Sequence, residues 1–178
     1  MPIDGPSTPG LIDWANAARY GTPLALIVLD VDFFKLYNDH FGHPAGDECL
    51  RKLAAILRTG RRARDFPARI GGEEFCLLVP DMTLEGAHSV AEIIRASVQK
   101  LQLKHPKSPM GVVTLSIGVA LAFPSGAMTA KELFRAADHA LYEAKRSGRN
   151  RVHIGEEACF PTAPLKELEG LSEGRSSG

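Results

Sequence analysis

The most informative segment of the sequence is Ile70-Gly71-Gly72-Glu73-Glu74-Phe75. It joins two short apolar runs, residues 66–70 (FPARI) and 75–80 (FCLLVP). Two such runs around a pair of glycines are typical of a β-hairpin, and glycine lets the backbone turn sharply or approach a ligand closely. Adjacent carboxylates in a turn repel each other, which favours a bound cation, with a divalent metal as the natural candidate. The alternative is a solvated hairpin tip with two surface glutamates.

Length, charge and cysteine content point to one intracellular α/β domain. The 178 residues include 21 basic and 21 acidic side chains, so the formal net charge of +0 argues against a surface for nucleic acid or acidic membrane. No apolar run approaches the ~18 residues of a membrane span, and the N-terminus lacks a signal-peptide pattern. The three cysteines, Cys49, Cys76 and Cys159, lack the spacing of metal ligands. They are expected to be reduced thiols in a cytosolic protein, and two of them are expected to lie in the core.

A continuous apolar run predicts the central strand. Residues 24–29 (LALIVL) precede Asp30-Val31-Asp32, and such a run is typical of a strand buried on both faces, with its acids at the C-terminal end. Ligand sites on α/β sheets gather at strand ends. The β-branched segment 112–121 predicts another strand of the same sheet, and residues 151–154 a short last one.

Apolar stripes and capping signals predict the helices. We expect a short helix at residues 33–39 and a loop at residues 41–47, where Pro44 and two glycines occur. This places Asp47 near the start of a helix over residues 48–58, where a helix N-cap is one interpretation of its carboxylate. The other expected helices cover residues 11–20, residues 84–101 behind a Thr83 cap, and a segment that starts at Ser125 or Thr129 and ends at Gly148.

Two acids from separate segments can form a metal site. Asp30 at the end of the central strand and Glu73 at the neighbouring hairpin tip supply the hard oxygen ligands that suit Mg²⁺, and the Val31 carbonyl can add another. Lys145 and Arg149 lie four residues apart near a helix end, where they can meet a triphosphate. Alternatively, the two cations simply offset the helix dipole.

Several motifs occur in the order and spacing of a known family. They are residues 29–35 (LDVDFFK), 38–39 (ND), 42–47 (GHPAGD), 68–75 (ARIGGEEF), 116–119 (SIGV) and 137–150 (ADHALYEAKRSGRN). Over residues 24–154 the chain resembles the GGDEF domain of diguanylate cyclases, in a GGEEF variant. Domain boundaries follow: a lead-in with a short helix at residues 1–22, the catalytic domain at 23–155, and a loose C-terminal tail at 156–178.

The resemblance implies both a fold and a reaction. The fold is α/β (α+β), with a central, mostly antiparallel sheet of about five strands flanked by helices, like the palm domains of nucleotide cyclases and polymerases. The reaction is the condensation of two GTP into cyclic di-GMP with release of pyrophosphate, dependent on Mg²⁺ or Mn²⁺. Each domain holds one GTP, so the active species is expected to be a homodimer. The family implies a cytoplasmic bacterial signalling enzyme, a nucleotidyltransferase.

The resemblance also implies roles for individual residues. Those expected to bind the metal are the carboxylates of Asp30 and Glu73 with the carbonyl of Val31. Glu73 and the neighbouring acid Glu74 are the expected catalytic acids. Asn38 and Asp47 are expected to bind the guanine edge of GTP. The backbone of Phe33 and Phe34 and the amine of the catalytic Lys35 are expected to contact the phosphates. Lys145 and Arg149 are expected to hold the β- and γ-phosphates. A carboxylate that accepts hydrogen bonds from the N1–H and the amino group of guanine disfavours adenine, because adenine lacks that pair of donors.

One further motif implies feedback by the product. Arg62-Ala63-Arg64-Asp65 has the family's R-x-x-D pattern, at the offset from Gly71 where members bind cyclic di-GMP as an inhibitor. The alternative is a surface ion pair. A catalytically silent domain that only binds cyclic di-GMP is the alternative function. The family's usual upstream motif is distorted at residues 4–10, so we expect that segment to be truncated or replaced.

Overall fold

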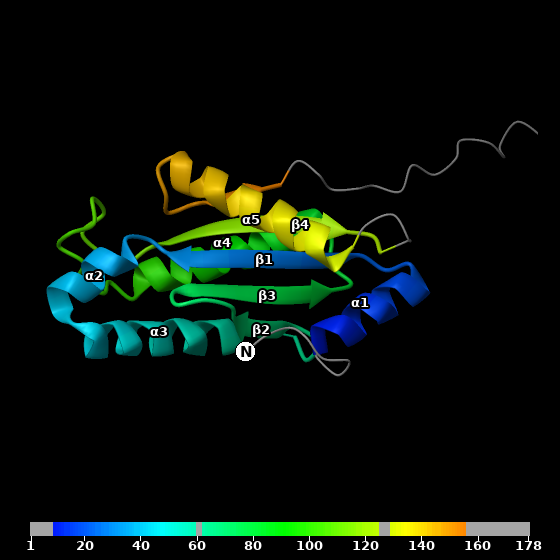
Figure 1. Cartoon of the computed structure of the whole chain (residues 1–178), viewed down its shortest axis with the longest axis horizontal. Coiled ribbons are helices and arrows are strands. Elements are labelled where there is room, and N and C mark those ends of the chain that lie inside the picture. The colour runs from blue at the N-terminus through cyan, green and yellow to red at the C-terminus, as the bar shows by residue number, and fades with distance from the viewer. Residues whose placement is uncertain (1–8, 60–61, 125–128, 156–178) are drawn as a thin grey trace, which may run out of the picture.

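The computed structural model describes residues 9–59, 62–124 and 129–155. The five helices and five strands of these ranges have the arrangement shown in Figure 1. In chain order they are α1 (Pro9–Tyr20), β1 (Leu24–Val31), α2 (Phe34–Phe41), α3 (His43–Arg58), β2 (Phe66–Arg69), β3 (Glu74–Pro80), α4 (Leu84–Lys100), β4 (Leu115–Ala122), α5 (Ala130–Arg146) and β5 (Val152–Ile154).

The strands form one five-stranded sheet in the order β2-β3-β1-β4-β5. β1 pairs antiparallel with both β3 and β4, and β2 pairs antiparallel with β3. Only β4 and β5 run parallel within the described sheet. The predicted hairpin, the central position of the first strand and the mostly antiparallel sheet are therefore confirmed.

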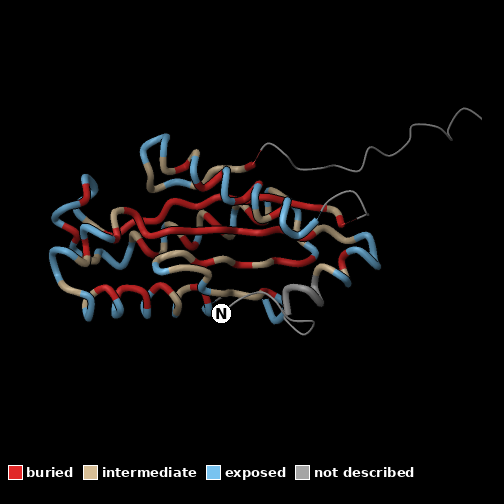
Figure 2. Tube along the Cα trace, viewed as in Figure 1, coloured by how far each residue is buried: buried red, intermediate tan, exposed pale blue. Residues whose placement is uncertain are grey.

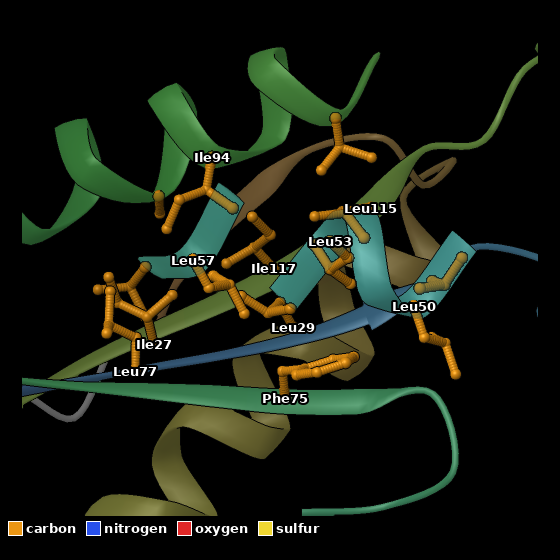
Figure 3. Packing of buried hydrophobic residues seen from close by; sticks show 14 of the residues in the cluster. Ile27, Leu29, Leu50, Leu53, Leu57, Phe75, Leu77, Ile94, Leu115 and Ile117 are labelled. Atoms are coloured by element: carbon orange, nitrogen blue, oxygen red, sulfur yellow. The ribbon is translucent and has the colours of Figure 1, made fainter. Parts of the chain in front are cut away.

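Apolar cores cover both faces of the sheet, because alternate residues of β1 point to opposite sides. Ala25, Ile27 and Leu29 belong to the larger cluster, which α2, α3 and α4 complete, and part of this cluster is shown in Figure 3. Leu24 and Leu26 belong to a second cluster on the other face, beneath α1 and α5. All eight residues of β1 are consequently buried, as Figure 2 shows along the central strand. The strand end is thereby held rigidly from both sides.

The predicted loop at residues 41–47 is wrong. A single residue, Gly42 with φ 84°, separates α2 from α3, and α3 begins at His43. Pro44 lies in the first turn of this helix, where a backbone N–H has no intrahelical partner and proline is tolerated. Asp47 is thus the fifth residue of α3 rather than a residue ahead of it, so the interpretation of Asp47 as the N-cap is also wrong.

The ends of other helices and strands differ from the predicted ones by a few residues. The strand predicted from residue 112 begins at Leu115, and Val112 makes only an isolated bridge to Lys104. Of the two candidate caps for α5, Thr129 holds the position, in a reciprocal capping box with Glu132. Residues 1–8, Ser125, Cys159 and the expected tail lie outside the described residues.

The membrane and thiol predictions can be compared with the structure directly. Across the described ranges, every helix is too short or too polar to cross a bilayer. Cys49 is buried and Cys76 is half-buried, and both are free thiols. Burial raises the pKa of each thiol to about 11, which keeps both neutral at physiological pH.

Candidate active site

The hairpin tip between β2 and β3 is closed by backbone hydrogen bonds and by an arginine. The N–H groups of Ile70 and Gly71 both donate to the Glu74 carbonyl, at 3.0 and 3.3 Å. The Arg69 guanidinium donates to the carbonyls of Gly71 and Gly72, at 3.2 Å to each from Nε. A Cβ at residue 71 would lie 2.5 Å from the Glu74 carboxylate, so a larger residue here would require the Glu74 side chain to move. Arg69 was not among the predicted site residues.

The acids of the central strand and of the hairpin lie close to one another. Asp30 on β1 pairs in register with Glu74 on β3. Burial raises the pKa of Asp30 from 3.8 to about 6; Lys145 opposes the rise, and the negative charges of Glu73 and Glu74 add to it. Such a carboxylate cluster carries more negative charge than one lysine neutralises.

Lys145 reaches this acid cluster directly. Its Nζ lies 3.0 Å from Oδ2 of Asp30, and the Asp30 side chain is 11% exposed. In the described residues no three Asp, Glu, His or Cys side chains surround a common point as a complete metal-binding set. Two carboxylates and the Val31 carbonyl still suit Mg²⁺, which commonly takes one or two protein carboxylates and completes its shell with phosphates and water.

The turn after β1 brings two of the predicted phosphate-binding residues, Phe33 and Arg149, into contact. Phe33 has a left-handed backbone, with φ 58°, and stands at the N-cap of α2. The Arg149 guanidinium lies 4.3 Å from the centroid of the Phe33 ring, within the range of a cation–π contact. Lys35 is exposed in the first turn of α2, whereas the Phe34 side chain is buried in the core, which leaves only its backbone for a ligand.

A buried carboxylate that we did not predict ties these segments together. Asp32 is 1% exposed and accepts hydrogen bonds from Thr114 Oγ1 at 2.7 Å, Ser116 Oγ at 2.6 Å and the Asn150 N–H at 3.1 Å. Thr114 and Ser116 belong to the β4 segment, and Asn150 follows Arg149. Asp32 therefore fixes the position of the Arg149 turn relative to the end of β1. The Asp-Val-Asp pattern was the one available signal for its importance.

Asn38 and Asp47 lie on the adjoining helices α2 and α3. Oδ1 of Asn38 is buried and accepts no hydrogen bond within the part of the chain that the structure describes. A Cβ at Gly46 would lie 1.9 Å from this oxygen, so α3 approaches Asn38 closely at a glycine. Asp47 is the next residue and borders a groove of about 380 Å³ between α3 and the β2–β3 hairpin, whose apolar lining includes Leu50, Ala54 and Phe75.

The R-x-x-D residues lie at the other end of β2 from the acids. The Arg62 N–H donates to Oδ2 of Asp65 at 2.8 Å, and the Arg62 guanidinium lies 3.6 Å from Oδ1. The same guanidinium donates to the Pro80 carbonyl at 3.4 Å. Asp65 is 5% exposed, whereas the Arg62 side chain is 51% exposed. The pair is thus preformed, with its cation available at the surface.

The chain matches one family throughout its described fold. The family profile described as "Diguanylate cyclase, GGDEF domain" matches residues 11–151. The probable diguanylate cyclase DgcT of Escherichia coli is 39% identical over 150 residues, which is 84% of this chain and 33% of DgcT. The chain therefore spans about a third of the length of such relatives.

Solved structures agree with the sequence comparison. The GGDEF domain of DgcB from Caulobacter crescentus, crystallised with c-di-GMP, superposes with a TM-score of 0.74 at 36% identity, covering 82% of this chain and 85% of that one. The active GGEEF domain of a diguanylate cyclase from Vibrio cholerae gives a TM-score of 0.72 at 36% identity, covering 83% and 92%. Given the profile match, the fold and the motifs, this chain belongs to the GGDEF-domain family of diguanylate cyclases.

Proposed function

We propose that this chain is a diguanylate cyclase domain, which condenses two GTP into cyclic di-GMP and releases pyrophosphate. The observation that carries the proposal is the meeting of Asp30, Glu73 and Glu74 with Lys145 at the junction of β1 and the hairpin. Silent members of the family usually lack an acid in the Gly-Gly turn, and both glutamates are present here. The names of the relatives support the same activity.

Asp30, Glu73 and the Val31 carbonyl would hold Mg²⁺ or Mn²⁺. When bound, the ion supplies a Lewis acid that neutralises charge on the α-phosphate and favours ionisation of the attacking 3′-hydroxyl. Burial raises the pKa of Asp30 to about 6 even with Lys145 beside it, so a bound cation would stabilise the charged carboxylate further. Lys145 supplies the present compensation and would turn to the β- and γ-phosphates when the nucleotide binds.

The remaining residues would orient one GTP in each protomer. The backbone N–H groups at the start of α2, the Lys35 amine and Arg149 face the phosphates, while Asn38 and Asp47 accept hydrogen bonds from the guanine N1–H and amino group. The buried Oδ1 of Asn38, with no partner in the described ranges, suits such a donor.

The chemistry requires two copies of the domain. The 3′-oxygen of one GTP attacks the α-phosphorus of the other; a 3′-O–P bond forms, the Pα–O–Pβ link breaks and pyrophosphate leaves. Glu74, the neighbouring acid, would accept the 3′-hydroxyl proton as the base of this step. A second, identical step with the roles exchanged closes the ring, giving one cyclic di-GMP and two pyrophosphates. The two sites must therefore face each other in a homodimer.

Pyrophosphate release tests this proposal against a silent binding module. With GTP and Mg²⁺ the protein should release pyrophosphate, and chelation of the metal should stop the release. ATP should release little pyrophosphate, because adenine lacks the donors whose hydrogen bonds Asn38 and Asp47 would accept. Binding of GTP or cyclic di-GMP without pyrophosphate release would instead favour the silent module.

A glycine on α3 provides a test of the guanine site. Gly46→Ala should lower the affinity for GTP by about tenfold or more, because the new Cβ displaces the Asn38 amide, as expected when a buried polar contact is lost. Its free energy of unfolding should change by less than about 1 kcal/mol, since alanine favours the helix and the Asn38 side chain can rotate away. Calorimetric titration and urea unfolding measure the two effects.

Gly86→Ala is the matched control for Gly46→Ala. It places the same methyl group on another helix, α4, where the new Cβ meets mainly the flexible Met82 side chain at 3.0 Å. GTP affinity should be unchanged. Equal losses in both variants would contradict a specific role for Asn38.

Product feedback is tested at the R-x-x-D pair. Arg62→Ala should raise the concentration of cyclic di-GMP needed for half inhibition by about tenfold, because a charged hydrogen-bonding partner and stacking surface is removed. The uninhibited initial rate should stay the same, since Arg62 lies at the far end of β2. The control is Arg64→Ala, which removes an exposed arginine paired with Asp81 at 2.5 Å. Unaltered inhibition in Arg62→Ala would leave the pair as a surface ion pair.

A further inference from the structure

His105 is a fully buried histidine that the sequence patterns did not select. It is 0% exposed and lies in the segment between α4 and β4. Its backbone N–H donates to the Gly111 carbonyl at 2.9 Å, and its own carbonyl accepts from the Ser108 N–H at 2.9 Å. The isolated bridge between Lys104 and Val112 closes the same segment at its base. The imidazole is therefore presented from a fixed backbone.

The ring of His105 is directed at the turn that follows β1. Its Nε2 lies 3.2 Å from the Phe33 carbonyl oxygen, and its plane meets the Tyr37 ring edge-on, at 87° with centroids 5.2 Å apart. A carbonyl only accepts, so Nε2 carries the proton. Nδ1 has no hydrogen-bond partner in the described ranges, which suits an unprotonated nitrogen in a neutral ring. Burial lowers the pKa of His105, in agreement with that neutral form.

The Phe33 carbonyl receives two hydrogen bonds. Besides His105, the Tyr37 N–H donates to it at 3.1 Å as the first helical bond of α2. Phe33 adopts φ 58°, a left-handed conformation that costs a bulky side chain about 1 kcal/mol or more. No side chain caps the N-terminus of this helix at Phe33. Contacts from outside the helix must therefore maintain the turn, and the His105 bond is one of them.

The same turn connects His105 to the phosphate-binding side chains. The Phe33 ring lies under the Arg149 guanidinium at 4.3 Å, and the free N–H groups at the start of α2 follow Phe33 directly. Rotation of the Phe33 peptide would displace both features together. The His105 ring is fully buried beside this turn, against the Tyr37 ring.

We propose that His105 is a positioning residue for triphosphate binding: its Nε2–H holds the Phe33 carbonyl, and with it the left-handed turn that sets Arg149 and the α2 N-terminus for the phosphates. This inference rests on the proposed GTP site and adds a residue outside it. It predicts that His105 acts on the triphosphate rather than on the guanine.

Substitutions at His105 separate a positioning role from general packing. His105→Leu removes the donor and keeps an apolar side chain, whereas His105→Gln can return an N–H to nearly the place of Nε2, and the shorter His105→Asn cannot. The control is His139→Leu, at an exposed histidine on α5. If His105→Leu fails to fold, the comparison of the glutamine and asparagine variants still decides the proposal.

Binding of two nucleotides without turnover is the first measurement. The probes are GTP with a methylene group between its α- and β-phosphates, which cannot release pyrophosphate, and GMP, which lacks the outer phosphates. His105→Leu and His105→Asn should bind the triphosphate analogue about tenfold more weakly and GMP within about twofold of the parent. His105→Gln should recover most of the loss. Equal weakening for both nucleotides, or no weakening, would overturn the proposal.

Amide hydrogen exchange in the nucleotide-free protein is the second measurement. The Tyr37 amide shares the Phe33 carbonyl with His105, so its exchange should quicken by about tenfold in His105→Leu and stay unchanged in His139→Leu. Unaltered exchange at Tyr37 would refute the positioning role even if GTP is turned over. Conversely, quickened exchange in a protein that makes no cyclic di-GMP would reject the cyclase proposal and retain the role of His105.

Discussion

Glu73→Ala is expected to lower the formation of cyclic di-GMP by about a thousandfold or more. Glu73 lies at the hairpin tip, and its negative charge contributes to the raised pKa of Asp30. Removal of one of two carboxylate ligands would weaken metal binding and leave charge on the α-phosphate uncompensated in the transition state. Steady-state product formation, followed by chromatography at saturating GTP and Mg²⁺, measures the effect.

The matched control for Glu73→Ala is Glu85→Ala, which removes an exposed glutamate from the first turn of α4. Its activity should equal that of the parent. Thermal unfolding of Glu73→Ala should show an intact fold, because the side chain is only half-buried and makes no structural hydrogen bond among the described residues. Retention of more than about a tenth of the parent activity would exclude Glu73 as an essential ligand.

Asp30→Asn is expected to abolish activity yet make the nucleotide-free protein more stable at pH 8. The pKa of Asp30 in the folded protein is about 6, above its ordinary value of 3.8, so the folded state disfavours the charged carboxylate. This difference corresponds to at most about 3 kcal/mol of free energy of unfolding. Asparagine removes the charge, but Lys145 then loses its ionic partner, which offsets part of the effect. The expected increase in the free energy of unfolding is therefore about 1 to 3 kcal/mol.

The sign of the pH dependence follows from the same pKa. Between pH 6 and pH 4 the folded parent binds more protons at Asp30 than the unfolded chain does, so the parent gains stability from this residue as the pH falls. Asp30→Asn lacks that gain, and its advantage should be largest above pH 6 and nearly vanish below pH 4. Urea unfolding at pH 8 and pH 4 measures the difference in stability between Asp30→Asn and the parent. Asp138→Asn, at an exposed residue of α5, is the control. A variant less stable than the parent at pH 8 would contradict an unfavourable charge at Asp30.

Local patterns were sufficient to predict the central strand and the hairpin, whereas the mostly antiparallel sheet was predicted from the family resemblance. The run at residues 24–29 has no polar interruption, and the paired glycines between two apolar runs allow few structures other than a hairpin. Once both elements lie in one antiparallel sheet, the register that places Asp30 opposite Glu74 brings the acids together. The motif resemblance then extended the prediction to the nucleotide-binding residues, whose individual roles remain predictions.

The errors and omissions have a common physical cause. Glycine and proline at residues 42–46 suggested a loop, but proline is compatible with a first helical turn, and Gly46 lies where α3 approaches the Asn38 side chain closely rather than in a turn. The partners of Asp32 lie 82 to 118 residues away in the sequence. His105 contacts Phe33 across 72 residues. Contacts of this kind depend on the folded sheet, and no local pattern reveals them.

The central claim is that two copies of this domain join two GTP molecules. The most direct test is incubation of the purified protein with GTP and Mg²⁺ at two protein concentrations about tenfold apart, with cyclic di-GMP and pyrophosphate quantified. We predict two pyrophosphates for each cyclic di-GMP, and a rate per protomer that rises with protein concentration because each turnover needs a pair of domains. Bound GTP without any cyclic di-GMP at either concentration would contradict the claim and leave the chain as a nucleotide-binding module.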